Sequence, residues 1–150
     1  MIDLAVNTLN ELEVDLVLHA GDYVSPFTVQ HFKPLTAKLV GVYGNNCAER
    51  MLLKHLFSDI GADLRGFFAE ITVGEVKVAL VHGHDAELLH SLIRLESYDL
   101  VVHGHTHRVC VQRKGKTLVV NPGEVCGYLS GQSTIGLYDP QLRDVKILSL

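Results

Sequence analysis

Three histidines occupy alternate positions in the segment HGHTH, residues 103–107, directly after a short apolar run. Imidazole nitrogens bind metals and exchange protons near neutral pH. In an extended segment, alternate side chains lie on the same side, so the rings of His105 and His107 are predicted to serve one site. A single histidine at a strand end is more often a packing or surface residue. The rest of the chain must therefore supply further ligands.

Polar side chains follow four other apolar runs in the same way. Ligands of α/β sheets bind outside the carboxyl ends of strands, where such residues meet. Gly-Asp and Gly-Asn-Asn are also ordinary turn sequences, so each segment alone is weak evidence. Five such segments in one short chain favour a shared metal site. The residues that follow the five runs are His19 and Asp22, Asn45 and Asn46, His82 and His84, 103–107, and 121–123.

The donor set combines a carboxylate, amides and several imidazoles. The cysteines Cys47, Cys110 and Cys126 are widely spaced and form no CxxC pair, which argues against a cysteine zinc site and a disulfide framework. Oxygen and imidazole donors suit Mn, Fe, Ni or Zn at a catalytic site with open positions. Two such ions about 3.5–4 Å apart, bridged by a carboxylate, can hold a phosphate and activate a water.

The elements that position these residues follow from the periodicity. Apolar residues at helical spacing predict three helices, and Ser25 with Pro26 predicts the start of another. Short apolar strands between helices predict parallel pairing, and later hairpins predict antiparallel pairing. We expect an α/β fold of two mixed sheets packed as a sandwich and flanked by helices. The helices are expected at 2–12, 48–57 and 86–97, and the strands at 15–19, within 37–46, at 68–73 and 76–82, near 100–102, in a hairpin turning at 114–115, and in 133–139 and 144–150.

The 150 residues suffice for one domain with one well-buried core. A hydrophobic fraction of 47% and a net charge of −4 predict a folded, soluble protein. The chain has no basic run, which argues against sequence-specific nucleic-acid binding. No apolar run approaches the roughly 20 residues of a membrane-spanning helix. The acidic N-terminal segment is neither a signal nor a transit peptide, so we expect a cytoplasmic protein with no membrane partner.

The blocks GD at 21–22, GNN at 44–46, HGH at 82–84 and GHTH at 104–107 resemble the calcineurin-like metallophosphoesterases. The resemblance covers essentially the whole chain and is strongest to small single-domain bacterial and archaeal phosphodiesterases. It implies two divalent metal ions in the strand-end loops, with manganese expected first and iron, nickel or zinc as alternatives. It also implies a phosphodiesterase that hydrolyses a small phosphate ester by attack of a metal-activated hydroxide.

The resemblance assigns metal ligands residue by residue. Asp22 is similar to the carboxylate that bridges the two metals. Asn45, His82 and His105 resemble the other ligands of the second metal, and His107 resembles a ligand of the first. Asn45 is also expected to act in catalysis by helping to neutralise charge on the phosphate oxygens.

The block at 44–47 departs from the family. In the family, this block often reads Gly-Asn-His-Asp, and its histidine protonates the leaving group. This chain has Asn46 and Cys47 at the last two positions. An amide can donate to a phosphate oxygen but cannot act as a general acid at neutral pH, so Asn46 is expected to bind substrate. His84 is the candidate catalytic acid, with orientation of a neighbouring ligand as the alternative. Loss of a general acid costs about 10²–10⁴-fold in rate.

The resemblance also implies an initial strand ending in Asp-x-His, and this chain has no such block. Met1 falls within what resembles the following helix, so we expect a single domain over 1–150 that is N-terminally truncated. That loss would remove two ligands of the metal that His107 serves. It would also leave a sheet edge that a second copy can cover, so a homo-oligomer is possible. The alternative function is a non-catalytic metal-binding or protein-scaffold member of the same fold.

Further residues near these motifs have simpler expected roles. His19 and His103 are expected to pack or to orient ligands by hydrogen bonds. The segment 121–123 is expected to be a turn that closes the wall of the site. Cys126 is expected to pack as a small apolar residue. Cys47 has no neighbouring base, so we do not expect it to act as a nucleophile.

Overall fold

The computed structural model describes all 150 residues. The predicted helices and strands are confirmed in type and order, with shifts of a few residues at their ends. In chain order, the elements are α1 (Ile2–Glu11), β1 (Leu16–His19), η1 (Pro26–Phe32), β2 (Lys38–Gly41), α2 (Arg50–Asp59), β3 (Asp63–Leu64), β4 (Phe68–Val73), β5 (Val76–Val81), α3 (Ala86–Arg94), β6 (Leu100–Val102), β7 (Val109–Lys114), β8 (Thr117–Pro122), β9 (Thr134–Asp139) and β10 (Asp144–Ser149).

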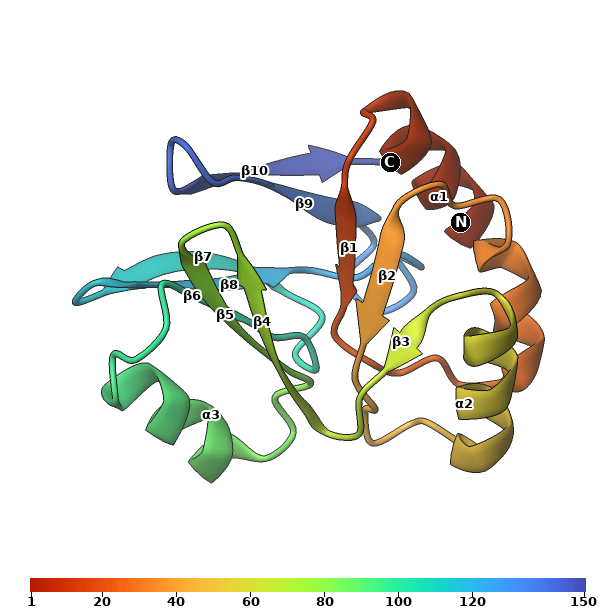
Figure 1. The fold of residues 1–150 in the computed structure, drawn as a ribbon, viewed down its shortest axis with the longest axis horizontal. Coiled ribbons are helices and arrows are strands. Elements are labelled where there is room, and N and C mark those ends of the chain that lie inside the picture. Colours follow the sequence, from red (N-terminus) through yellow and green to blue (C-terminus); the bar gives the residue numbers. More distant parts are fainter.

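The strands form two layers, which confirms the α/β sandwich (Figure 1). One layer is a mixed sheet in the order β4-β5-β6-β8-β7, with parallel central strands and antiparallel edge strands. The other layer contains the parallel sheet β1-β2-β3 and, beyond β1, the antiparallel hairpin β9-β10. No hydrogen-bonded ladder joins β1 to this hairpin, so the second layer consists of two separate sheets.

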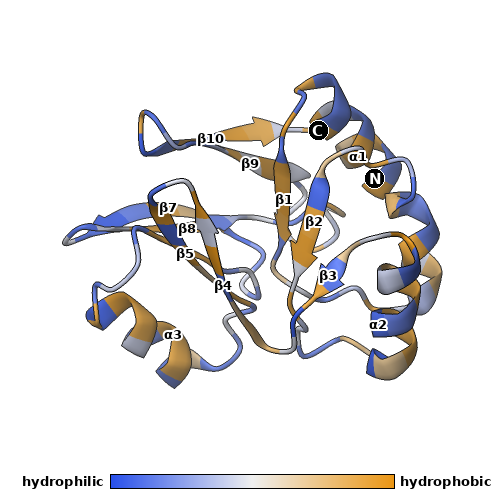
Figure 2. Ribbon diagram, viewed as in Figure 1, coloured by the Kyte–Doolittle hydropathy of each residue, from blue (hydrophilic) through white to orange (hydrophobic).

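The buried side chains form three clusters rather than the single core expected. The largest lies between the two layers, where Val40 and Val42 pack with Val78 and Leu80. A second cluster lies between the parallel sheet and the helices α1, η1 and α2, and a third lies under α3. Because both faces of each sheet are apolar, two layers produce three buried interfaces. The apolar stripes of β1, β2 and α3 are visible in Figure 2.

Local chemistry explains where two of the elements lie. Ser25 caps η1, because its hydroxyl accepts a hydrogen bond from the Phe27 N–H at 3.3 Å, and Pro26 is the first residue of the helix. The two-residue strand β3 was not predicted, because so short a segment has no detectable period. None of the helices is both long and apolar enough to cross a membrane.

Candidate metal centre

His82 lies where the loops after β1, β2 and β5 meet, and its side chain is 3% exposed. Its Nδ1 lies 2.7 Å from the carbonyl oxygen of Ala20. A carbonyl can only accept, so Nδ1 carries the proton and Nε2 has a free electron pair. Burial lowers the pKa of His82, although the Ala20 hydrogen bond and Asp22 oppose this, which favours the neutral ring.

The free Nε2 of His82 faces two oxygen atoms from the other loops. It lies 2.9 Å from Asn45 Oδ1 and 3.4 Å from Asp22 Oδ2. Three electron-pair donors therefore converge with no proton between them, an arrangement that a cation would stabilise. Donors about 2.1 Å from an octahedrally coordinated ion lie about 3 Å apart, so the observed spacing fits a divalent metal.

The rim of this centre carries two exposed histidines. The ring centroid of His105 lies 5.1 Å from that of His82, and the ring of His84 lies 5.4 Å from it. No group of three or more His, Cys, Asp or Glu side chains is close enough to bind a metal. The candidate centre therefore depends on the Asn45 amide together with Asp22 and His82.

Asn46 bonds to Asp22 in this structure. Its backbone N–H donates to Asp22 Oδ1 at 2.8 Å, and its side-chain amide donates to Oδ2 at 3.0 Å. The loops can approach this closely because of Gly44, where a Cβ would lie 2.0 Å from Asp22 Oδ1. A contact between Asn46 and substrate stays a prediction, and so does the role of His84 as an acid.

Three of the candidate ligands have left-handed backbone conformations. The φ angles of Asp22, His105 and His107 are 59°, 64° and 57°. Such conformations cost on the order of 1–3 kcal/mol each and concentrate at functional sites. The expectation of an extended HGHTH segment is therefore wrong. The Thr106 N–H donates to the Gly104 carbonyl at 2.8 Å and closes a tight turn. The His105 ring lies beside His82, whereas His107 contacts Glu124.

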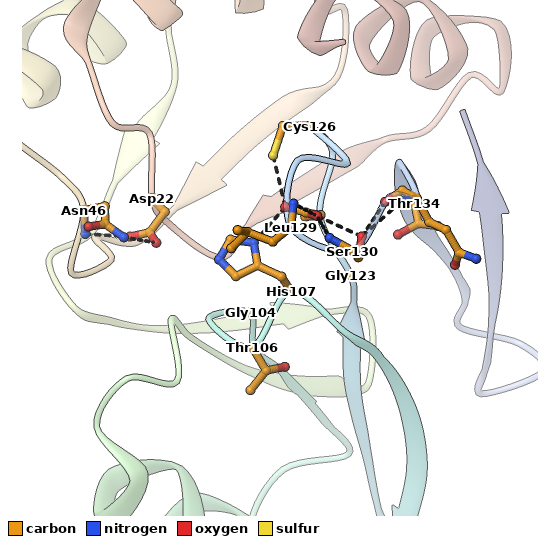
Figure 3. A network of polar contacts seen from close by, with 12 residues as sticks. Asp22, Asn46, Gly104, Thr106, His107, Gly123, Cys126, Leu129, Ser130 and Thr134 are labelled. Atoms are coloured by element: carbon orange, nitrogen blue, oxygen red, sulfur yellow. Dashed lines mark hydrogen bonds and ion pairs between the residues drawn. The ribbon is translucent and has the colours of Figure 1, made fainter.

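His107 points to a separate group of polar residues (Figure 3). Its Nδ1 lies 2.9 Å from Glu124 Oε2, and no contact joins it to Asp22, Asn45 or His82. The carboxylate accepts the Nδ1 proton, which leaves Nε2 of His107 available to a metal. His107 is thus not one of the donors that converge on His82.

Sequence reasoning missed Glu124, whose side chain is 4% exposed. Its Oε1 accepts from the backbone N–H groups of Leu129 and Ser130 at 2.8 and 2.6 Å, and Oε2 accepts from the Cys126 thiol at 3.1 Å. Burial raises the pKa of Glu124, but hydrogen bonds from Ser130, Cys126 and His107 lower it to about 2. The available signal was that Glu124 is the only acidic residue in 100–138.

Two expectations for the neighbouring loop are wrong. Asn121 is not in a turn but in β8, where it is fully buried. Its amide donates to the Gly104 carbonyl at 2.7 Å and to Thr106 Oγ1 at 3.0 Å, and these two hydrogen bonds stabilise the GHTH turn. Cys126 is exposed rather than packed as an apolar residue, and its thiol donates to Glu124 Oε2 at 3.1 Å.

The supporting histidines behave as predicted. His19 stacks on Tyr23, with ring centroids 4.2 Å apart, and its Nδ1 accepts from the Gly21 N–H at 3.1 Å. Burial lowers the pKa of His19 to about 4. His103 is 8% exposed, and its pKa is also lowered by burial. Cys47 is buried, with its sulfur accepting from the Gly44 N–H at 3.2 Å.

Comparison with known proteins identifies the family of the chain. A calcineurin-like phosphoesterase superfamily domain matches residues 1–142. The chain is 36% identical over 147 residues to Phosphodiesterase MJ0936 of Methanocaldococcus jannaschii, covering 97% of this chain and 89% of that protein. A solved archaeal phosphodiesterase structure matches with a TM-score of 0.94 and 36% identity, over 99% of this chain and 91% of the other.

A single mutant of Vps29 from Entamoeba histolytica shares the fold, with a TM-score of 0.70 and 20% identity over 98% of this chain and 87% of the other. At this identity the similarity concerns the fold alone. The family match and the archaeal relatives extend over most of the chain and include each of the strand-end loops described above. The chain therefore belongs to the calcineurin-like phosphoesterase superfamily.

Proposed function

We propose that the 150 residues form one domain with metal-dependent phosphodiesterase activity on small phosphate esters, with Mn²⁺ as the preferred ion. The observation that carries this proposal is the convergence of His82 Nε2, Asn45 Oδ1 and Asp22 Oδ2 with no proton between them. The family match supports hydrolysis of a phosphate ester, and the archaeal relatives named phosphodiesterases support a diester substrate.

In this proposal, Asp22, Asn45, His82 and His105 hold one divalent ion, and His107 is a ligand of a second. A divalent ion in this setting supplies charge neutralisation at the phosphate and activation of the attacking water. The Oδ1 atom of Asn45 would bind the ion, which would leave its NH₂ group free to donate to a phosphate oxygen.

Two further residues would act on the substrate. Asn46 uses one amide proton on Asp22 and keeps the second for a phosphate oxygen. His84 is exposed at the rim and can protonate the departing oxygen. Because position 46 is not a histidine, the proposal favours diesters with good leaving groups. All three cysteines are free, which fits the reducing cytoplasm that we propose as the location.

The test is hydrolysis of bis-p-nitrophenyl phosphate after EDTA treatment, with Mn²⁺ or Ni²⁺ added back. We expect turnover only with added metal, and a loss of at least about 100-fold in kcat/KM for His82→Ala and Asn45→Ala. His90→Ala is the matched control, because His90 is an exposed histidine on α3 outside the site. Absence of metal-dependent turnover, with the metal bound, would contradict the enzyme and favour the non-catalytic alternative. Full activity in His82→Ala would contradict the site.

A further inference from the structure

An aromatic side chain stands exposed beside the candidate centre. Phe67 lies in the turn between β3 and β4, and it is 44% exposed. Its ring centroid lies 6.0 Å from that of His84, which in turn lies 5.4 Å from that of His82. A phenylalanine left half in water gives up much of the free energy that burial would provide. Core packing therefore does not account for this position.

The ring is nevertheless held in place. The guanidinium carbon of Arg50 lies 4.8 Å from the ring centroid of Phe67, and the Tyr43 ring lies 5.8 Å from it. The Tyr43 hydroxyl donates to the Arg50 carbonyl at 2.9 Å, and the Tyr43 N–H donates to the Gly66 carbonyl at 2.6 Å. These contacts tie the turn to the end of β2. They hold the ring in place and still leave Phe67 44% exposed.

Arg50 also gives this surface a positive charge. Its guanidinium takes part in none of the ion pairs of the structure and in no side-chain hydrogen bond. An exposed, uncompensated cation next to an aromatic face suits a ligand that is both flat and anionic. The His84 ring lies between Phe67 and His82, 6.0 Å from the first and 5.4 Å from the second, measured between ring centroids. A ligand whose phosphate lies at the centre can therefore reach Phe67 with its ester arm.

We infer that Phe67, Arg50 and His84 form a subsite for a flat aromatic ester arm of the substrate, either an aryl group or a nucleobase. The inference rests on the proposed function, because the phosphate must bind at the candidate centre. The arm stacks on Phe67 and lies on the side of His84, the candidate acid, which identifies it as the leaving group. Stacking of an aromatic pair contributes about 0.5–1.5 kcal/mol beyond area burial, equivalent to about 2- to 12-fold in affinity.

The test uses phosphate monoesters as ligands, because their single ester arm can occupy the subsite while the phosphate binds at the centre. Each pair sets an arm with an aromatic group against an arm without one. Isothermal titration calorimetry with the Mn²⁺-loaded protein gives the Kd of phenyl phosphate against cyclohexyl phosphate, and of thymidine 5′-monophosphate against 2-deoxyribose 5-phosphate. Phe67→Leu keeps an apolar side chain and removes the π face. Phe68→Leu is the matched control, because Phe68 is the adjacent aromatic, 38% exposed, and its ring packs near Tyr98 instead.

We expect the wild-type protein to prefer the aromatic member of at least one pair, and Phe67→Leu to lower that preference by about 2- to 12-fold. The pair that shows the preference identifies the arm as aryl or nucleobase. No preference in either pair, or equal losses in Phe67→Leu and Phe68→Leu, would overturn the subsite. Turnover of bis-p-nitrophenyl phosphate on the same samples separates the two proposals: turnover without aromatic preference overturns only the subsite, and preference without metal-dependent turnover overturns only the enzyme.

Discussion

Replacement of Glu124 by glutamine tests how the loop after β8 sets the tautomer of His107. Oε1 of Glu124 accepts from the backbone N–H groups of Leu129 and Ser130, and Oε2 accepts from His107 Nδ1 at 2.9 Å. The backbone donors cannot reverse, so the glutamine oxygen must face them and its NH₂ group must face His107. His107 Nδ1 must then accept, which moves the ring proton to Nε2, the nitrogen that the wild type leaves free.

The magnitude follows from the contact that is lost. A hydrogen bond to a charged group contributes about 1.5–3 kcal/mol, and this carboxylate is 4% exposed, so water compensates little. We expect Glu124→Gln to lower the free energy of unfolding by about 2 kcal/mol in urea denaturation. Groups that orient a metal-binding histidine contribute about 10- to 100-fold to metal affinity, and the variant should lose that factor for an ion bound by His107.

The direct assay is ¹⁵N-resolved NMR of the histidine rings without metal, which reports which nitrogen carries the proton. We expect Nδ1–H for His107 in the wild type and Nε2–H in Glu124→Gln. The control is Ser130→Ala, which removes a hydroxyl that donates to Oε1 at 2.8 Å and leaves the His107 contact intact. An Nδ1–H tautomer that persists in Glu124→Gln, or one that is lost in Ser130→Ala, would refute the argument.

Three further predictions concern the residues around the centre. Burial lowers the pKa of His19 from 6.5 to about 4, so the unfolded chain binds the extra proton between these values. The contribution of His19 to stability is therefore full above pH 6.5 and is lost as the pH falls toward 4, by at most about 3 kcal/mol, because the residue is only partly buried. Urea unfolding should show a weaker pH dependence in His19→Gln, and an unchanged pH dependence would contradict this origin. Gly44→Ala places a Cβ 2.0 Å from Asp22 Oδ1 and should weaken Mn²⁺ binding by about 10-fold or more in calorimetry. Unchanged affinity would show that metal binding does not need the close contact between the loops after β1 and β2. Asn121→Ala removes the buried amide that donates to the Gly104 carbonyl and to Thr106 Oγ1, and it should lower the free energy of unfolding in urea by about 1–3 kcal/mol. A change near zero would show that Asn121 does not support the GHTH turn.

Much of the fold could be predicted because each regular element has a clear apolar pattern. The alternation in 68–73 and 76–82 corresponds to the paired strands β4 and β5, and the pattern before Gly44 corresponds to β2. The pattern predicted sheets covered by helices, but it could not divide the buried residues among three clusters, because the partner of each buried face is set only in three dimensions. It also could not reveal β3, because this strand has only two residues. They pair in parallel with β2, and α2 connects the two strands in the chain.

The candidate site was partly predictable for a topological reason. Asp22 and Asn45 follow the parallel strands β1 and β2 of one sheet, and His82 follows β5 of the facing sheet. The three residues therefore meet at one end of the sandwich although they are far apart in sequence. The pairing of His107 with Glu124 was not predictable from spacing, since it depends on how the loop after β8 folds back. The left-handed conformation of His105 was missed because alternation alone suggests an extended segment.

We propose that a divalent ion held by Asp22, Asn45 and His82 drives hydrolysis of a phosphodiester. The most direct test is a Mn²⁺ titration of EDTA-treated protein, with bound Mn²⁺ and bis-p-nitrophenyl phosphate turnover measured on the same samples. We predict that turnover rises with the number of ions bound, and that His82→Ala loses both together. Turnover without bound metal, or full turnover in His82→Ala, would contradict the claim.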